Sequence, residues 1–137
     1  MLAVLCAGSA ASAAPAAGDV IGVIDFQQVV FKHPAFEEAT KQLQQTRRQK
    51  ESEAKAMADK ETEPAKKAQA VQTKRMELVK EEQRLMEPIF KECQEAVRVV
   101  AKKKNITLVL ENASVYFGGA DITEDVIKQV ILTNAKK

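Results

Sequence analysis

The sequence is poor in turn-forming residues and in aromatic side chains. No glycine stands anywhere from residue 35 to residue 104, and no aromatic residue stands between Phe36 and Phe90. This stretch consists mostly of alanine, glutamine, glutamate, lysine and arginine, which are strong helix formers. The sequence therefore predicts that its whole middle part is helical.

Motifs for catalysis and for crossing a membrane are missing as well. The chain has one histidine, His33, and two cysteines, Cys6 and Cys93, and no phosphate-binding glycine loop, metal-ligand cluster or nucleophile motif accompanies them. No apolar run approaches the ~20 residues that a membrane span needs. We therefore expect no enzyme, no cofactor and no metal site. His33 is expected in a solvated or capping role, and Asp25 and Asp121 as a helix cap and a turn residue.

Residues 1–18 differ in composition from the rest of the chain. A short apolar run is followed by small residues with cleavable small-x-small sites such as Ala11-Ser12-Ala13. This pattern is typical of the end of a secretory signal peptide, and a disordered alanine-rich tail is the alternative. Removal of the segment would leave Cys93 as the one cysteine, without a disulfide partner. We expect Cys93 to be a small apolar residue on a buried helix face.

Two prolines, Pro64 and Pro88, divide the helical stretch. A proline inside a helix removes a hydrogen-bond donor and clashes with the preceding turn, so each should end, start or kink a helix. Thr62 or Glu63 is suited to cap a helix that has Pro64 in its first turn. The sequence thus predicts an outgoing helix over residues 35–63, roughly 40 Å long, and a returning helix that enters the rest of the protein near Pro88.

The two predicted helices show only a weak packing pattern. The returning helix carries Val71, Leu78 and Leu85 at a seven-residue spacing, which is a sparse heptad repeat. The pattern indicates two helices that lean together without a tight coiled-coil seam. The net charge of +2 argues neither for nor against a nucleic-acid partner.

The large apolar residues gather at the two ends of the chain. Residues 20–24 read as a buried strand, and residues 106–110 and 115–117 as the two strands of a hairpin. Asn105 is suited to end the helix before them, and Thr123 to cap a final helix. We therefore expect an α+β fold: a small antiparallel β body, residues 19–34 and 88–137, from which a long helical hairpin, residues 35–87, projects. A body of this size is marginal alone, which predicts an oligomer.

Several segments together resemble the Skp/OmpH family of periplasmic chaperones. They are Ile21-Gly22-Val23-Ile24-Asp25-Phe26-Gln27, His33-Pro34-Ala35-Phe36, Pro88-Ile89, Val100-Ala101-Lys102-Lys103, Leu108-Val109-Leu110-Glu111, Asn112-Ala113-Ser114-Val115-Tyr116 and Asp121-Ile122-Thr123-Glu124-Asp125-Val126-Ile127. Their order around a charged hairpin covers residues 19–137 as one Skp/OmpH-like domain.

The resemblance implies a periplasmic homotrimer shaped like a jellyfish, with three helical arms around a cavity. It also implies an ATP-independent holdase for unfolded outer-membrane β-barrel proteins, with anionic lipid or lipopolysaccharide as a further contact. The hairpin here is shorter than the resemblance leads us to expect. Adaptable apolar residues on the arms are the candidate client-binding residues: Leu43, Met57, Met76, Leu78 and Val79. Apolar residues of the predicted strands are the candidates for the core of the body and oligomer: Ile21, Val23, Leu108, Leu110 and Tyr116.

Two other functions fit the same residues. A structural coiled-coil scaffold of the cell envelope would need tightly packed arms, and the sparse heptad argues against it. A nonspecific polyanion binder would use the arm lysines and arginines. It would lack base-stacking aromatic residues, and its binding would collapse as salt is added.

Overall fold

The computed structural model describes residue 18 and residues 20–137, so the expected signal-peptide region lies outside the described residues except for Gly18. Three short strands, four α-helices and one 3-10 helix make up this part of the chain. In chain order they are β1 (Ile21–Ile24), α1 (Phe26–Phe31), α2 (Phe36–Lys60), α3 (Pro64–Lys103), β2 (Leu108–Glu111), η1 (Asn112–Ser114), β3 (Ala120–Asp121) and α4 (Thr123–Ala135).

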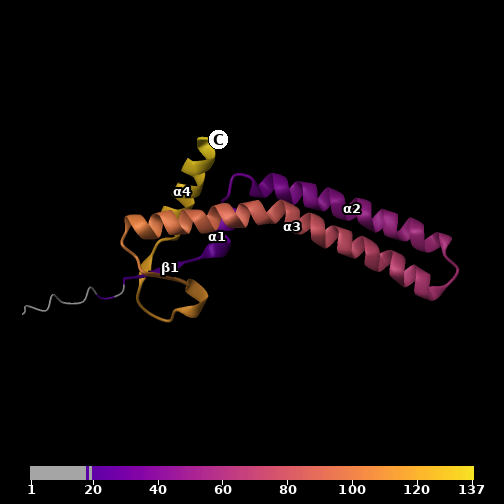
Figure 1. Ribbon diagram of the computed structural model, residues 1–137, viewed down its shortest axis with the longest axis horizontal. Coiled ribbons are helices and arrows are strands. Elements are labelled where there is room, and N and C mark those ends of the chain that lie inside the picture. The colour runs from indigo at the N-terminus through magenta and orange to yellow at the C-terminus, as the bar shows by residue number, and fades with distance from the viewer. Residues whose placement is uncertain (1–17, 19) are drawn as a thin grey trace, which may run out of the picture.

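The helices α2 and α3 form the predicted hairpin. They run side by side away from the strands and are joined at the far end of the molecule (Figure 1). Glu63 is the N-cap of α3 and Pro64 occupies its first turn, as expected. Pro88 lies inside α3, which continues without a break to Lys103. The ribbon of α3 bends along its length (Figure 1), which is the usual effect of a proline inside a helix.

The sheet is parallel, so the prediction of an antiparallel β body was wrong. Its strand order is β2-β1-β3, and β1 pairs in parallel with both neighbours. The predicted hairpin of residues 106–110 and 115–117 does not form, because residues 112–114 make η1 and the third strand is Ala120–Asp121. The physical reason is the position of β1. Its continuous apolar run fits a strand with neighbours on both sides, as in parallel sheets.

Three predicted helix boundaries can be compared with the structure. Asp25 Oδ1 accepts a hydrogen bond from Gln28 N at 2.9 Å and caps α1, as expected. Asn105 follows α3 with φ 53°, the left-handed conformation that ends helices. Thr123 does not cap α4: Ile122 occupies the N-cap position, and the Thr123 N–H donates to Asp121 Oδ1 at 2.9 Å.

The end of α3 is a Schellman motif. Ile106 N donates to Ala101 O at 2.9 Å, and Asn105 N donates to Lys102 O at 3.3 Å. The motif reverses the chain directly into β2. It therefore fixes where the sheet begins relative to the long helix.

The hydrophobic core lies where α1, α3 and α4 pack against the sheet. Val29, Cys93, Ile122 and Val126 are completely buried there, and Figure 1 shows α4 standing across the body end of α3. Cys93 is thus an apolar core residue on a helix, as predicted. Its burial raises the pKa of the thiol to about 11, so the thiolate that would react is scarce at neutral pH.

His33 is buried, so the prediction of a solvated histidine was wrong. It joins the turn between α1 and α2 to α3: its Nδ1 accepts from Ala35 N at 3.1 Å, and its Nε2 lies 3.1 Å from Glu92 Oε2. Asn134 Nδ2 donates to the same Glu92 oxygen at 3.0 Å. The predicted alternative of a capping role is not formed either, because α2 begins at Phe36 and its N-cap is Ala35, without a side-chain cap hydrogen bond.

Candidate binding surface of the helical hairpin

The two arms of the hairpin meet along a thin seam in which the buried residues are alanines. Ala54 of α2 and Ala70 of α3 are buried, and the seven-residue series Val71, Leu78 and Leu85 is half-buried. Small side chains allow the helices to approach closely but bury little apolar surface. The seam therefore positions the arms while leaving most of their surface exposed.

A ring of four charged residues links the arms at mid-length. Lys50 Nζ lies 2.7 Å from Glu77 Oε2 and 3.4 Å from Glu53 Oε2, and Lys74 Nζ lies 3.0 Å from an oxygen of each glutamate. Hydrogen bonds from Lys74 and Gln49 hold the pKa of Glu53 at about 2. The Glu77 pKa is also lowered, chiefly by its hydrogen bond to Lys50. Each carboxylate thus contacts cations from both helices.

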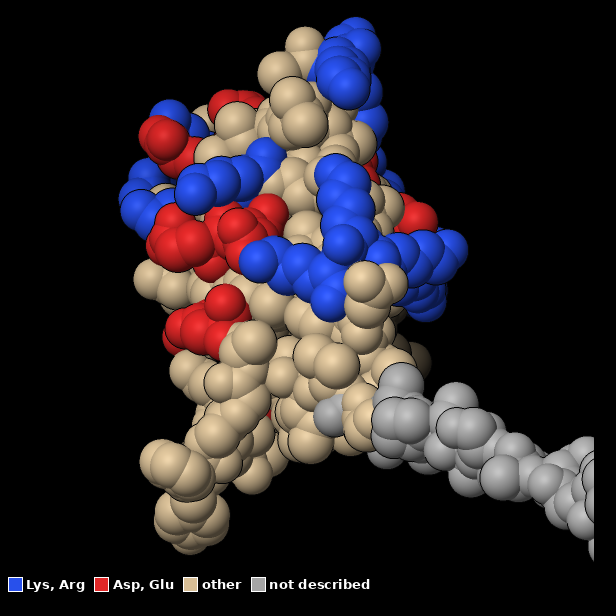
Figure 2. Space-filling view, turned by 90° about the vertical axis from the view of Figure 1, so that its left-hand side faces the viewer, with Lys and Arg blue, Asp and Glu red and all other residues tan. Residues whose placement is uncertain are grey.

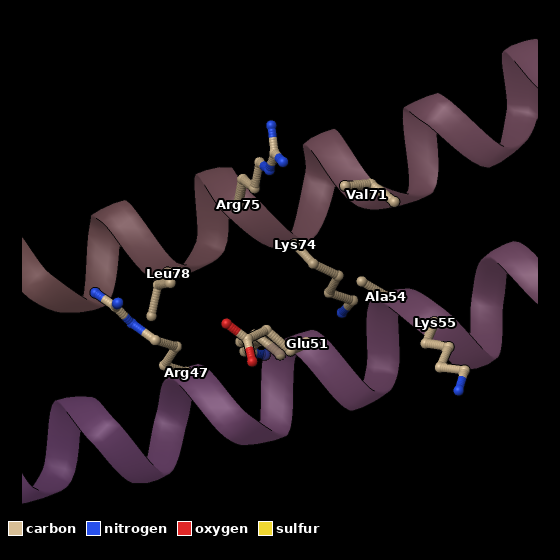
Figure 3. A pocket seen from close by; sticks show the side chains of 9 residues that line it. Arg47, Glu51, Ala54, Lys55, Val71, Lys74, Arg75 and Leu78 are labelled. Carbon is tan, nitrogen blue, oxygen red and sulfur yellow. The ribbon is translucent and has the colours of Figure 1, made fainter.

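Next to this ring lies a cleft between the arms, which we call the mid-arm cleft (Figure 3). Figure 3 shows Lys74 reaching from α3 toward α2 and Arg47 reaching from α2 toward Leu78. Arg47, Lys55 and Arg75 line the cleft and make no ion pair within the described residues, and Glu51 is its one other charged residue outside the ring. The cleft therefore carries a positive charge excess.

The five residues predicted to bind clients fall into two groups. The side chains of Met57, Met76 and Val79 are 42%, 50% and 45% exposed, so they are accessible on the arms. Leu43 and Leu78 are half-buried, and Leu78 also lines the mid-arm cleft. The accessible group is spread along the hairpin and does not form one pocket.

A further apolar surface, at the base of the hairpin, was not predicted from the sequence. Two adjoining hollows share Met86 and Phe90; one extends along α3 to Val79, and the other reaches α1 and the start of α2. We call them together the basal groove. Four of the five phenylalanines line it: Phe26, Phe31, Phe36 and Phe90.

Aromatic pairs frame this basal groove. The Phe26 and Phe90 rings stack with centroids 6.4 Å apart, and the Phe31 and Phe36 rings meet edge to face at 5.1 Å. Phe31 is nevertheless 55% exposed and Phe90 41% exposed. None of these rings was among the predicted client-binding residues. The usable signal was the concentration of three phenylalanines within residues 26–36, just before an arm without aromatic residues.

Comparison with known proteins shows which family this chain belongs to. The family model described as "Outer membrane protein (OmpH-like)" matches residues 59–130, which is more than half of the 137-residue chain. The chain belongs to the OmpH-like family. The matched range starts at the end of α2 and extends through α3, β2 and β3 into α4, whereas the central strand β1 lies before it. No curated protein matches the sequence.

Members of the OmpH-like family are periplasmic chaperones that bind outer-membrane proteins, and they are not enzymes. The first two segments that carried the resemblance, within residues 21–36, lie outside the matched range. None of the helices in the described part of this OmpH-like chain is both long and apolar enough to cross a bilayer.

The residues predicted for the body and oligomer core lie largely at the surface of the single OmpH-like chain. Ile21 and Leu108 are 38% and 48% exposed, and Tyr116 is fully exposed beside an equally exposed Phe117. Val23 and Leu110 are half-buried. Figure 2 shows the end of the body opposite the arms: lysines and arginines, with acidic residues beside them, gather over its upper part, while its lower part carries almost no charge.

Proposed function

We propose that this protein is an ATP-independent periplasmic holdase that binds unfolded outer-membrane proteins and prevents their aggregation. The observation that carries the proposal is the exposure of Met57, Met76 and Val79 along a charged hairpin. A holdase must accept many sequences, and dispersed apolar contacts with flexible methionine side chains suit weak binding of varied partners.

The proposal includes an oligomer, for which we propose a homotrimer of jellyfish shape. The body, residues 19–34 and 88–137, would join the subunits, and the hairpin, residues 35–87, would project as the arm. Exposed apolar side chains on the body support an interface between copies: Ile21, Leu108, Tyr116 and Phe117. Three arms that contact one client would raise the effective concentration of each weak contact.

The mid-arm cleft supports a second contact, with an anionic lipid or lipopolysaccharide. Arg47, Lys55 and Arg75 provide positive charge that no carboxylate of the described residues pairs with. Exposed charges of this kind are screened by salt. Binding at this cleft would therefore weaken steeply as ionic strength rises.

The test of the holdase function is aggregation of a client. An unfolded β-barrel membrane protein is diluted from urea with and without a molar excess of this protein, in the absence of ATP, and light scattering is followed. We expect the scattering to be suppressed. Unchanged scattering in the presence of the folded protein would contradict the holdase function and favour the scaffold alternative.

A further inference from the structure

We propose that the basal groove docks segments of unfolded polypeptide in which an aromatic side chain stands next to lysine or arginine. The inference rests on the proposed holdase function and adds the class of segment that the base of the arm takes. It assigns client contact to α1 and the body end of α3, in addition to the exposed apolar residues farther along the hairpin.

The apolar part of the groove fits an inserted aromatic ring. The Phe26–Phe90 and Phe31–Phe36 pairs frame the hollows that meet at Met86. The hollow along α3 has a volume of about 670 Å³ and the one beside α1 about 430 Å³. Aromatic rings add edge-to-face or offset-stacked contacts to such pairs, and the flexible Met86 side chain adjusts to different rings.

The charges around the groove determine which residues can flank the inserted aromatic residue in the bound segment. Its charged lining residues are three glutamates and one lysine: Glu82, Glu87, Glu111 and Lys91. Lys91 Nζ is already 2.6 Å from Glu87 Oε1. Within the described residues, Glu82 makes no ion pair and the Glu111 carboxylate accepts only from Phe26 N, at 3.2 and 3.4 Å. Two carboxylates thus remain to attract a cationic side chain beside the aromatic rings.

The same charge pattern argues against two segments of this chain as the occupant. The exposed Tyr116-Phe117 pair of a second copy has no lysine or arginine within residues 105–127, and residues 1–18 contain neither. A client segment with an aromatic residue flanked by basic residues complements the groove better than either. The mid-arm cleft has the opposite charge excess, so the two surfaces favour different segments of one client.

The test uses two fluorescent peptides that share an alternating tyrosine–serine core and differ only in lysine or glutamate flanks. Binding to the full-length protein is followed by fluorescence anisotropy at low salt. We expect the lysine peptide to bind on the order of tenfold more tightly than the glutamate peptide, because of electrostatic complementarity. Glu82→Lys, at an exposed helix position, should abolish most of this preference.

The apolar contribution is tested with Phe31→Ser combined with Phe90→Ser. This double variant should bind the lysine peptide at least about tenfold more weakly, as expected when aromatic residues that a bound segment would cover are removed. The matched control is Ile131→Ser with Leu132→Ser, which alters two side chains of α4 with 48% and 49% exposure outside the groove. Circular dichroism establishes whether each variant folds. If the phenylalanine variant does not fold, the Glu82→Lys variant still tests the proposal.

Three outcomes would overturn the inference. If Glu82→Lys retains the full preference for the lysine peptide, the groove carboxylates do not select the segment. If the folded phenylalanine variant binds both peptides as the wild type does while still suppressing aggregation, the holdase function stands and the groove is not its docking site. If that variant binds both peptides as the wild type does but changes the oligomeric state in sedimentation, a second copy of the chain covers the groove.

Discussion

The Asp25 backbone N–H donates a hydrogen bond of 3.0 Å to the Thr123 hydroxyl, across a separation of 98 residues. The contact ties the end of β1 to the start of α4. The same Asp25 caps α1 through its side chain, so one residue connects the sheet, α1 and α4. Thr123 is itself buried, at 5% exposure.

Thr123→Val tests this connection. Valine has the shape of threonine but cannot accept a hydrogen bond, which leaves the partly buried Asp25 N–H without its partner. We expect a loss of about 1–3 kcal/mol in the free energy of unfolding, measured by urea denaturation. Thr123→Ser keeps the hydroxyl and should lose less. Equal losses in the two variants would show that packing of the methyl group, and not the hydrogen bond, stabilises this junction.

Alanine substitution at the two glycines before β3 should lower stability to different extents. Gly118 and Gly119 both have positive φ, at 89° and 85°. A Cβ at Gly118 would meet no other atom within 4 Å, whereas a Cβ at Gly119 would collide with Val23 Cγ2 in β1. Gly118→Ala should therefore cost only backbone strain of about 1–2 kcal/mol. Gly119→Ala should cost about 1–3 kcal/mol more, because the clash disturbs the pairing of β3 with β1.

Thermal unfolding of the two alanine variants measures this difference. Gly118→Ala is the matched control, since it introduces the same strain without the clash. A Gly119→Ala variant as stable as Gly118→Ala would mean that β1 shifts freely to accommodate the methyl group.

The ring of charges between the arms predicts a pH dependence. The Glu53 pKa is about 2 in the folded protein, against a usual value of 4.5. A carboxylate with a lowered pKa stabilises the fold fully above its unfolded-state pKa, and this contribution is lost as pH falls toward the folded-state value. The melting temperature of wild type should thus exceed that of Glu53→Gln above about pH 5 and converge with it near pH 2.

Glu51→Gln is the control for the ring, because Glu51 lies on the same helix and makes no ion pair within the described residues. Its melting temperature should follow that of the wild type more closely across the same pH range. A gap between wild type and Glu53→Gln that persists unchanged at pH 2 would show that the ring is not its source.

Substitution of the exposed arm residues should weaken client binding without lowering the stability of the protein. Serine at Met57, Met76 and Val79 together should reduce suppression of client aggregation several-fold, because apolar contacts with the client are lost. The melting temperature should hardly change, since these side chains are about half exposed. Serine at Leu43 and Leu78 should instead lower arm stability. Full suppression by the triple variant would show that these three side chains do not carry client binding.

The hairpin could be predicted from the sequence because local chemistry determines it. Strong helix formers, the Glu63–Pro64 start and the Asn105 end act within a few residues, and the structure has each of them where expected. Proline at position 88 was harder to interpret. Packing on both sides of it keeps α3 continuous: Ile89 and Cys93 are buried in the core, and Leu85 and Met86 pack against it.

The sheet could not be predicted in the same way, because its pairing is non-local. The short spacing between residues 106–110 and 115–117 favoured a hairpin, but β1 inserts between the two later strands. The basal groove was missed for a related reason. Phe26, Phe31 and Phe36 approach Phe90 only after the long hairpin has folded back, and no local pattern encodes that approach.

The central place of β1 in its sheet also means that the sheet can form only after the C-terminal strands are present. Ile21 pairs with Leu108, and Val23 pairs with Asp121, so every strand partner of β1 comes from the last third of the chain. The helical hairpin joins two helices that follow each other in the chain, and all of its residues are available once residue 103 has been made. Closing the sheet requires the ends of a long loop to meet, which is slow and entropically costly. In a chain made from its N-terminus, the residues of the arm are therefore present before the strands that pair with β1.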